Sequence, residues 1–251
     1  MTKIILSGAQ GRMGKVITQL ATENSAYEIV AGIDRQVVTS ATFPSYHTLA
    51  DVKESADVVI DFSYFENVPA LLDDAQASAL PIVVATTGLP EETLKKMESV
   101  SQTIPVFFSA NMSLGINVLI QALQQITPSL EADFDIEMIE KHHNQKKDAP
   151  SGTALLLADS INDVCQTKKE YVFGRQGNHN ENLRSQMGIH AVRGGTIPGE
   201  HTVLFAGQDE LIELKHTALS RDIFANGALK AAAFLVTQKP GLYSMNDLLA
   251  H

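Results

Sequence analysis

The sequence predicts an α/β protein whose first part is a Rossmann-like, doubly wound parallel sheet. Over the first 112 residues, short apolar segments rich in Val, Ile and Phe alternate with helix-like segments. A glycine-rich loop follows the first apolar segment. Apolar runs of this kind are typical of strands buried on both faces, and their alternation with helices predicts parallel strands joined by crossover connections.

The expected elements follow one another in a regular order. Strands are expected at KIILS (3–7), EIVAGI (28–33), DVVIDFS (57–63), PIVVATT (81–87) and PVFFSAN (105–111). Helices are expected between them at 11–22, 68–79 and 91–101. Because ligands bind outside the carboxyl ends of parallel strands, the residues that follow these strands are candidates for a binding site.

The pattern changes after about residue 112. A long helix is expected at 113–125, and the segment DFDIEMIEKHH that follows is expected to form a strand ending near His142. Another helix and a polar stretch at 167–187 precede the segments GIHAVRGG, EHTVLFAG and ELIELKHT. Short polar turns between these segments predict an α+β domain with a mostly antiparallel or mixed open sheet. The last helix, at 222–237, has an apolar face that we expect to pack on the first domain.

Composition excludes several classes of protein. The chain has 251 residues, a net charge of -10 and a single cysteine, Cys165, which excludes an internal disulfide and a multi-thiolate metal site. The acidic balance argues against a nucleic-acid partner, and no apolar run is long enough to predict a membrane span. The beginning, MTKIILSGAQ, becomes polar too early for a signal peptide, so we expect a cytoplasmic protein.

A dinucleotide site is predicted at the segment ILSGAQGRMG. Gly8, Gly11 and Gly14 follow the first strand, and glycines there allow a tight turn and close approach of the backbone to a pyrophosphate. Asp34 ends the second strand, where a carboxylate accepts hydrogen bonds from ribose hydroxyls, and Arg35 follows it. The alternative is an ordinary glycine turn beside a solvated Asp-Arg pair.

Small polar residues also end the fourth and fifth expected strands. Thr86 and Thr87 lie in VATTG, and Asn111 lies in FSANMS. Their positions predict contacts with the nicotinamide half of a dinucleotide. Threonines at strand ends can instead cap the helix that follows.

The segment EKHHNQKKDAPSGTA predicts a site for an anion and a proton transfer. Imidazoles donate protons near neutral pH, and a lysine near other cations can do the same, so His142, His143 and Lys146 are candidates for this chemistry. Asp148 and Pro150 lead to Ser151, which is expected to cap a helix. The first backbone N–H groups of that helix, at 152–153, are then available to a carboxylate or phosphate.

Three other interpretations of this segment are open. The two histidines could bind zinc, although no thiolate cluster or H-E-x-x-H motif accompanies them. The lysines could simply form a solvated basic loop. Cys165 could be a nucleophile, but no glycine elbow or paired base is evident near it.

Together, GAQGRMG, ATTG, SANMS, EKHHNQKKDAPSGTA, VRGGTIPGEHTVLF and SRDIFANGA resemble the 4-hydroxy-tetrahydrodipicolinate reductase family of lysine and diaminopimelate biosynthesis. The resemblance implies an enzyme that transfers hydride from NADH or NADPH to a cyclic dicarboxylate. It implies that His142 donates a proton with help from Lys146, and that substrate is held by His143, Gly152 and Thr153. No metal is implied. The implied cofactor contacts are Gly8, Ala9, Gln10, Gly11, Arg12, Met13, Asp34, Arg35, Ala85, Thr86, Thr87, Ser109, Ala110, Asn111 and Met112.

The resemblance also implies an organisation of the chain. Residues 1–112 and 222–251 would form a discontinuous dinucleotide-binding domain, and residues 113–221 a substrate-binding domain that assembles a homotetramer. Gln10, Ala85 and Met112 depart from the residues associated with the family, and Lys147 has no family role. Because Asp34 disfavours a 2'-phosphate that Arg35 favours, we expect both cofactors to work, with a modest preference for NADH. The alternatives are a related Rossmann oxidoreductase acting on another small carboxylate and a non-catalytic NAD-sensing protein.

Overall fold

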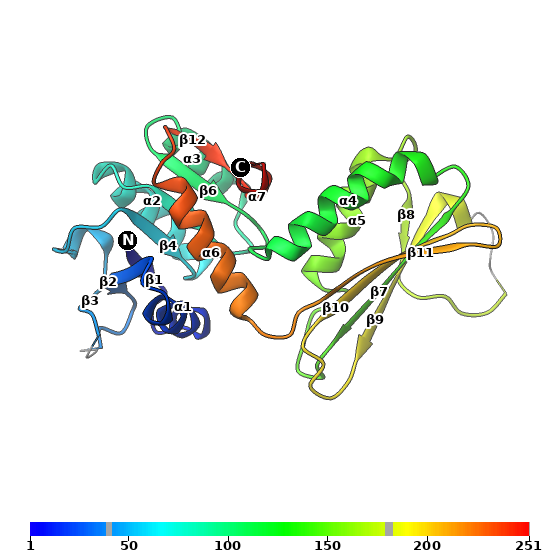
Figure 1. Cartoon of the computed structure of the whole chain (residues 1–251), viewed down its shortest axis with the longest axis horizontal. Coiled ribbons are helices and arrows are strands. Elements are labelled where there is room, and N and C mark those ends of the chain that lie inside the picture. The colour runs from blue at the N-terminus through cyan, green and yellow to red at the C-terminus, as the bar shows by residue number, and fades with distance from the viewer. Residues whose placement is uncertain (39–41, 179–182, 251) are drawn as a thin grey trace. The chain divides into compact units, whose positions relative to one another are not determined.

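The computed structural model describes residues 1–38, 42–178 and 183–250. Residues 179–182 of the expected polar stretch and residue 251 of the expected first domain therefore lie outside the described residues. The chain forms two compact units (Figure 1), which are Met1–Leu114 with Arg221–His251, called unit 1, and Gly115–Ser220, called unit 2. In the described part of the chain, no helix has both the length and the hydropathy to cross a bilayer.

Unit 1 contains a parallel sheet of seven strands in the order β12-β6-β5-β4-β1-β2-β3. Strand β1 lies between β2 and β4, so the strand order reverses there, which is where dinucleotides bind in doubly wound sheets. The Rossmann-like fold predicted from the sequence is confirmed. The strands are β1 (Thr2–Ser7), β2 (Tyr27–Ile33), β3 (Ser45–Tyr46), β4 (Val58–Asp61), β5 (Ile82–Val84), β6 (Pro105–Phe108) and β12 (Gly241–Tyr243).

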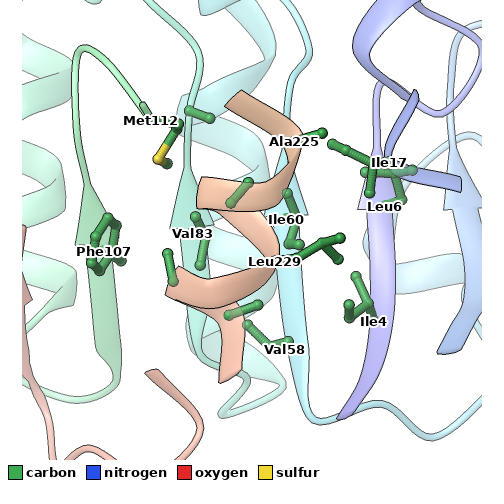
Figure 2. Close-up of a cluster of buried hydrophobic side chains, with 14 of the residues drawn as sticks. Ile4, Leu6, Ile17, Val58, Ile60, Val83, Phe107, Met112, Ala225 and Leu229 are labelled. Carbon is green, nitrogen blue, oxygen red and sulfur yellow. The ribbon is translucent and has the colours of Figure 1, made fainter. Parts of the chain in front are cut away.

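Helices cover both faces of this sheet. Ile4 and Leu6 of β1 pack on one face with apolar residues of α1 and α6, as Figure 2 shows, and Ile5 packs on the other face with residues of α2 and α3. Successive residues of a strand point to opposite faces, which explains why β1 is apolar at consecutive positions. The helices of unit 1 are α1 (Arg12–Glu23), α2 (Val68–Ala77), α3 (Glu91–Val100), α6 (Asp222–Leu235) and α7 (Met245–Leu249).

Several boundaries in unit 1 differ from the expected ones. The strands expected to reach residues 87 and 111 end at Val84 and Phe108. Beyond them, Thr86 donates its hydroxyl hydrogen bond to Asp61 of β4, and Ser109 donates to the Asn111 carbonyl group. Strands β3 and β12 are too short to produce a detectable alternation. Helix α7 was also missed, although Ser244 and Asp247 form a capping box that is visible in the sequence.

Unit 2 contains a five-stranded sheet in the order β11-β10-β7-β9-β8. Strand β10 is antiparallel to both β7 and β11, whereas β9 is parallel to β7 and β8. The sheet is therefore mixed rather than mostly antiparallel, because a connection that contains α5 separates β7 from β9 along the chain. The elements are α4 (Leu114–Leu130), β7 (Asp135–His142), α5 (Gly152–Val164), β8 (Glu170–Val172), β9 (Gln186–Arg193), β10 (Glu200–Ala206) and β11 (Leu211–Thr217).

Two differences from the expected elements have simple causes. Helix α4 extends beyond residue 125 because Ile126 and Leu130 continue its apolar face onto the core of unit 2, despite Pro128 inside the helix. Strand β8 and a short 3-10 turn (Leu183–Ser185) occur in the expected polar stretch. Tyr171 of β8 packs against the same core, which a polar composition did not reveal.

One face of the unit 2 sheet packs against helices α4 and α5. On β7, the alternate residues Ile136 and Met138 are buried in this core. Because side chains alternate along a strand, Glu140 and His142 lie on the same face, beyond the apolar pair. The strand therefore delivers an acid and a histidine to the end of the core, beside the segment that leads into α5.

Candidate active site

A cavity of about 620 Å³ lies in unit 1 at the carboxyl ends of strands β1, β2 and β4. Most of the glycine loop and the Asp34–Arg35 pair line it. The sequence-predicted residues that line the cavity are Gly8, Gln10, Gly11, Arg12, Met13, Asp34 and Arg35. A cavity of this size and position fits part of a dinucleotide.

The glycine loop has the geometry that a dinucleotide requires. Gly8 has φ 77°, a conformation that other residues rarely adopt, and a Cβ atom there would meet the Phe62 carbonyl group. A Cβ atom at Gly14 would collide with the carbonyl oxygens of Gly8 and Ala9, so this glycine allows helix α1 to begin close to β1. Gly11 is the N-cap of α1 and leaves the first turn without a side-chain cap. The residues present therefore fit a pyrophosphate at the start of α1.

The predicted ribose and phosphate contacts also lie at this cavity. Asp34 follows β2, and its Oδ2 atom accepts a hydrogen bond of 2.9 Å from the backbone N–H of Gln10. The Arg35 guanidinium lies 5.0 Å from the centroid of the Tyr64 ring and 3.6 Å from a carboxylate oxygen of Glu66. Tyr64 and Glu66 line the same cavity and were missed. The sequence feature that could have identified them is their position just after strand β4, the neighbour of β1.

The other predicted cofactor residues lie outside this cavity. Ala9, Ala85 and Met112 are buried in the unit 1 core. Ser109 and Asn111 bond with each other, because the Ser109 hydroxyl donates to the Asn111 carbonyl. The remaining predicted residues outside the cavity lining are Thr86, Thr87 and Ala110, of which Thr86 is buried and the other two are exposed.

Asp61, at the end of β4, is a buried carboxyl group that sequence reasoning missed. It accepts hydrogen bonds from the hydroxyls of Thr86 at 2.6 Å and Ser7 at 2.8 Å. Burial raises the pKa of Asp61, and the hydrogen bonds oppose that shift. These contacts tie together the ends of three neighbouring strands, β1, β4 and β5, and the Thr86 hydroxyl is therefore turned toward Asp61.

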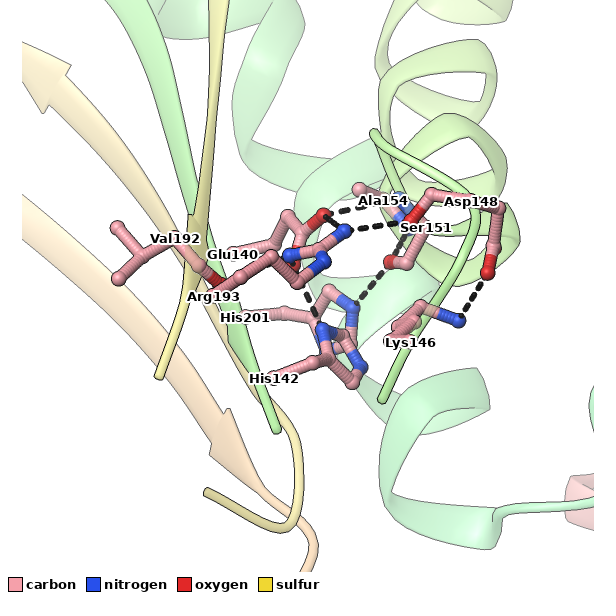
Figure 3. Close-up of polar contacts among 9 residues, drawn as sticks. All are labelled: Glu140, His142, Lys146, Asp148, Ser151, Ala154, Val192, Arg193 and His201. Carbon is pink, nitrogen blue, oxygen red and sulfur yellow. Dashed lines mark hydrogen bonds and ion pairs between the residues drawn. The ribbon is translucent and has the colours of Figure 1, made fainter. Parts of the chain in front are cut away.

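A second polar cluster lies in unit 2, around the Glu140 side chain (Figure 3). Glu140 is fully buried, and its carboxylate receives hydrogen bonds from Arg193 at 2.6 and 2.7 Å and from the Ser151 backbone at 3.0 Å. It also lies 2.6 Å from Nδ1 of His142. Although burial raises the pKa of Glu140, the hydrogen bonds from Arg193, His142 and Ser151 lower it below its usual value. Glu140 is therefore ionised at neutral pH.

The other ring nitrogen of His142, Nε2, lies beside Gly199. Within the described residues, Nε2 forms no hydrogen bond. A Cβ atom at Gly199 would lie only 3.2 Å from Nε2, so a side chain at that position would cover it. Burial lowers the pKa of His142, the Glu140 carboxylate raises it, and the cations of Lys146 and Arg193 lower it further, with a net downward shift.

His201 of β10 lies beside His142. Their ring centroids are 5.1 Å apart, and Nε2 of His201 lies 2.8 Å from the Ser151 hydroxyl, which also accepts the Ala154 N–H. Burial and the neighbouring His142 lower the pKa of His201 to about 4, so this ring is neutral at pH 7. Glu140, Arg193 and His201 were all missed. Their signal was the placement of Glu140 two residues before His142, together with the segments VRGG and GEHT.

Lys146 lies in the loop between β7 and α5. Its Nζ atom is 3.0 Å from Oδ1 of Asp148, and its side chain is 21% exposed. Although burial raises the pKa of Asp148, hydrogen bonds from Lys146 and the Gly152 backbone lower it. As predicted, Ser151 caps α5, so Gly152 and Thr153 are the first residues of that helix. His143 is half-buried in the same loop, and Lys147 is exposed.

The unit 2 cluster can therefore perform acid–base chemistry beside an anion. His142 offers a nitrogen that can carry a proton, and Lys146 and the start of α5 provide positive electrostatic potential. Cys165 is poorly suited to act as a nucleophile, because burial and the nearby Glu131 carboxylate raise the pKa of its thiol to about 11. No group of three His, Cys, Asp or Glu side chains suited to a metal occurs in the part of the chain that the structure describes.

Comparisons with known proteins match both parts of the chain to one family. Residues 2–112 match the family described as "Dihydrodipicolinate reductase, N-terminus", and residues 115–249 match "Dihydrodipicolinate reductase, C-terminus". The chain is 55% identical over 249 residues to a 4-hydroxy-tetrahydrodipicolinate reductase of Caldanaerobacter subterraneus subsp. tengcongensis, covering 99% of this chain and 98% of the relative. A second reductase of that name, from Clostridium tetani, is 47% identical and covers 99% of this chain and 97% of the relative.

A solved structure has the same fold. The dipicolinate-bound dihydrodipicolinate reductase from Paenisporosarcina sp. TG-14 superimposes with a TM-score of 0.84 at 24% sequence identity, covering 98% of this chain and 99% of the other. The two matching family descriptions cover both halves of the described fold, and the relatives match along almost the whole chain. The protein therefore belongs to the dihydrodipicolinate reductase family.

Proposed function

We propose that this protein is the NAD(P)H-dependent reductase of 4-hydroxy-tetrahydrodipicolinate in lysine biosynthesis, with His142 as its proton donor. The observation that carries this proposal is the pairing of His142 Nδ1 with buried Glu140, while Nε2 has no hydrogen-bond partner among the residues that the structure describes. Family membership supports the substrate and the reaction class. The contact of His142 with Glu140 supports the assignment of His142 as the proton donor.

The proposed cofactor site is the unit 1 cavity. When bound, the reduced nicotinamide supplies a hydride. Residues 8–13 hold the pyrophosphate at the start of α1, and the Asp34 carboxylate accepts hydrogen bonds from the ribose. We assign residues 85–87 and 109–112 to the nicotinamide half, because they follow β5 and β6 at the carboxyl edge of the sheet. Since Ala85 and Met112 side chains are buried in the core, they contribute through the backbone.

The proposed substrate site is the cluster at the start of α5. The relative from Paenisporosarcina sp. TG-14 has bound dipicolinate, a planar ring that carries two carboxylates. We assign Lys146, Gly152 and Thr153 to one carboxylate, since a cation and a helix N-terminus both favour negative charge. Asp148 now holds Lys146 at 3.0 Å, so an incoming carboxylate shares or replaces this contact. His143, in the same loop, is proposed to hold the substrate as well.

His142 is proposed to complete the reduction. Once the 4-hydroxyl group has left as water, hydride adds to one end of the resulting carbon–carbon double bond and negative charge develops on the neighbouring carbon. A positioned acid lowers the barrier to protonation of that carbon. Because burial and nearby cations lower the pKa of His142, it is largely neutral in the free protein at pH 7. A bound dianion favours the charged imidazole, so His142 acquires its proton together with the substrate. A protein that only senses NAD needs no such acid.

The function is tested by replacing His142 with Gln. We expect wild-type protein to oxidise NADH and NADPH when 4-hydroxy-tetrahydrodipicolinate is supplied, and the variant to lose about 100-fold or more in kcat. Cofactor affinity should be nearly unchanged, because the cofactor cavity is lined by unit 1. Absorbance at the reduced nicotinamide band measures turnover, and fluorescence titration measures cofactor binding. Near-normal turnover of the variant would contradict the role of His142.

Lys146 and Lys147 form a matched pair of variants. Lys146→Met should lower kcat and raise the KM for the substrate, because its ammonium lies beside the start of α5 and 3.0 Å from Asp148. Lys147→Met removes the same charge one residue away at an exposed position and should change both constants less than about 2-fold. Steady-state kinetics of the two variants at saturating cofactor provide the comparison. Equal changes in kcat and KM in both variants would mean that Lys146 contributes only positive charge and has no specific role at the substrate site.

Cofactor preference is proposed to depend on Asp34 and Arg35. Both cofactors should work, with a modest preference for NADH, because Asp34 repels a 2'-phosphate that Arg35 attracts. Arg35→Ala should weaken NADPH binding more than NADH binding, by about 1 to 2 kcal/mol for one charge-assisted contact at a partly wet site. Glu66→Gln should act in the opposite direction, since Glu66 competes for Arg35. The dissociation constants of NADH and NADPH for wild type and both variants test this prediction. If Arg35→Ala weakens the binding of both cofactors equally, Arg35 packs against the adenine and does not recognise the 2'-phosphate.

We further propose a homotetramer assembled through the open face of the unit 2 sheet. Val192 of β9 is 43% exposed and Leu211 of β11 is 54% exposed, which leaves apolar side chains in contact with water. Strands β8 and β11 are the two edges of this sheet. Symmetric pairing of such surfaces is a common route to closed oligomers. Light scattering at assay concentration should give four times the mass of the chain, and a stable monomer would refute the proposal.

A further inference from the structure

The Glu140 carboxylate is surrounded by hydrogen-bond donors. Arg193 contributes two N–H groups, at 2.6 and 2.7 Å, and the Ser151 backbone contributes one at 3.0 Å. An ionised carboxylate can only accept hydrogen bonds. The fourth neighbour, Nδ1 of His142 at 2.6 Å, must therefore carry a hydrogen atom that it donates to Glu140.

This contact determines which nitrogen of His142 is available for chemistry. With Nδ1 protonated, the neutral ring has its lone pair on Nε2, and the charged ring has its dissociable proton there. If Nε2 carried the hydrogen of the neutral ring instead, Nδ1 would direct a lone pair at a carboxylate. That arrangement places two acceptors 2.6 Å apart inside the protein, where repulsion between them is weakly screened.

Arg193 determines where the Glu140 carboxylate can lie. Its two terminal nitrogens contact both carboxylate oxygens, so the pair has the bidentate geometry that fixes a carboxylate in one plane. The same guanidinium donates a hydrogen bond of 2.7 Å to the Asp148 carbonyl oxygen. Glu140 and Arg193 therefore connect His142, the loop that carries Lys146, and the Ser151 cap of α5.

The charges around His142 come from several elements. Glu140 shares its strand, Arg193 lies on β9, and Lys146 lies on the loop that follows β7. His201 on β10 faces the ring but is neutral at pH 7. The Arg193 charge opposes part of the Glu140 effect on the pKa of His142, and the contact between Nδ1 and the Glu140 carboxylate sets the orientation of the ring.

We infer that Glu140, held by Arg193, is the positioning residue that fixes the Nδ1–H tautomer of His142 and directs Nε2 toward the substrate. The inference rests on the proposed role of His142 as proton donor. Glu140 itself touches no reacting atom and acts only through the imidazole. This role adds to the proposed function the atom that delivers the proton, which is Nε2 of His142.

The test compares Glu140→Gln with the double variant Glu140→Gln/Arg193→Gln. In the single variant the amide can donate to Nδ1, which favours the unproductive tautomer, and the Arg193 charge loses its carboxylate partner. The double variant removes both buried charges and should recover thermal stability relative to the single one. In both variants we expect kcat to fall about 10-fold or more, with cofactor affinity unchanged, because the ring has the wrong tautomer.

A matched control exists on the same strand. Glu137 lies on the opposite face of β7 and also contacts an arginine, Arg175 at 2.6 Å, and a histidine, His190 at 2.7 Å. Glu137→Gln therefore makes the same chemical change in a similar setting that lacks His142. We expect its kcat to stay within about 2-fold of wild type.

Two readouts distinguish positioning from a purely structural role. Two-bond ¹H–¹⁵N NMR correlations, assigned with His142→Gln, should show Nδ1–H in wild type and in Glu137→Gln, and a shift toward Nε2–H in both Glu140 variants. Because Glu140 raises the pKa of His142, the alkaline fall in kcat should move to lower pH when it is replaced. The NMR measurement requires no turnover, so a failed substrate assay with wild type would contradict the proposed function alone. An unchanged tautomer, or wild-type kcat in the double variant, would overturn the inference.

Discussion

Burying a carboxylate without partners is very costly, and this constraint on Glu140 organises the site in unit 2. The side chain is fully buried, so its oxygens must be satisfied by protein donors, and they draw together Arg193, Ser151 and His142. These donors come from a neighbouring strand, from the start of α5 and from the same strand. One buried charge thus fixes the geometry of the histidine, the loop and the helix terminus at once.

Unit 1 satisfies its own polar groups in a similar manner. Asp61 is buried at the end of β4 and receives hydroxyl hydrogen bonds from Ser7 and Thr86 on the two neighbouring strand ends. Asp34 receives the backbone N–H of Gln10, which holds the glycine loop against the end of β2. In both units, carboxylates at strand ends order the backbone around a site, and the apolar core behind them provides rigidity.

The sequence could predict the fold because its signals are local. Buried strands such as β1 and β4 are continuous apolar runs, and α5 begins at the Ser151 cap that the sequence indicates. The glycine loop and the HHNQK segment were found because their chemistry lies within a few residues. Glu140, Arg193 and His201 could not be grouped in advance, since their contacts depend on the register of β7 with β9 and β10. The same holds for Tyr64 and Glu66, which line the unit 1 cavity from the segment that follows β4.

We propose that the His142 ring is largely neutral in the free protein and gains a proton when a dicarboxylate binds. Its environment contains Glu140, Arg193, Lys146 and a neutral His201, and burial lowers its pKa in the free protein. The most direct measurement is calorimetric titration of dipicolinate into cofactor-bound protein at pH 8, in buffers with different ionisation enthalpies. The account predicts uptake of about one proton per bound dicarboxylate, and loss of that uptake in His142→Gln. Binding without proton uptake, or equal uptake in the variant, would contradict it.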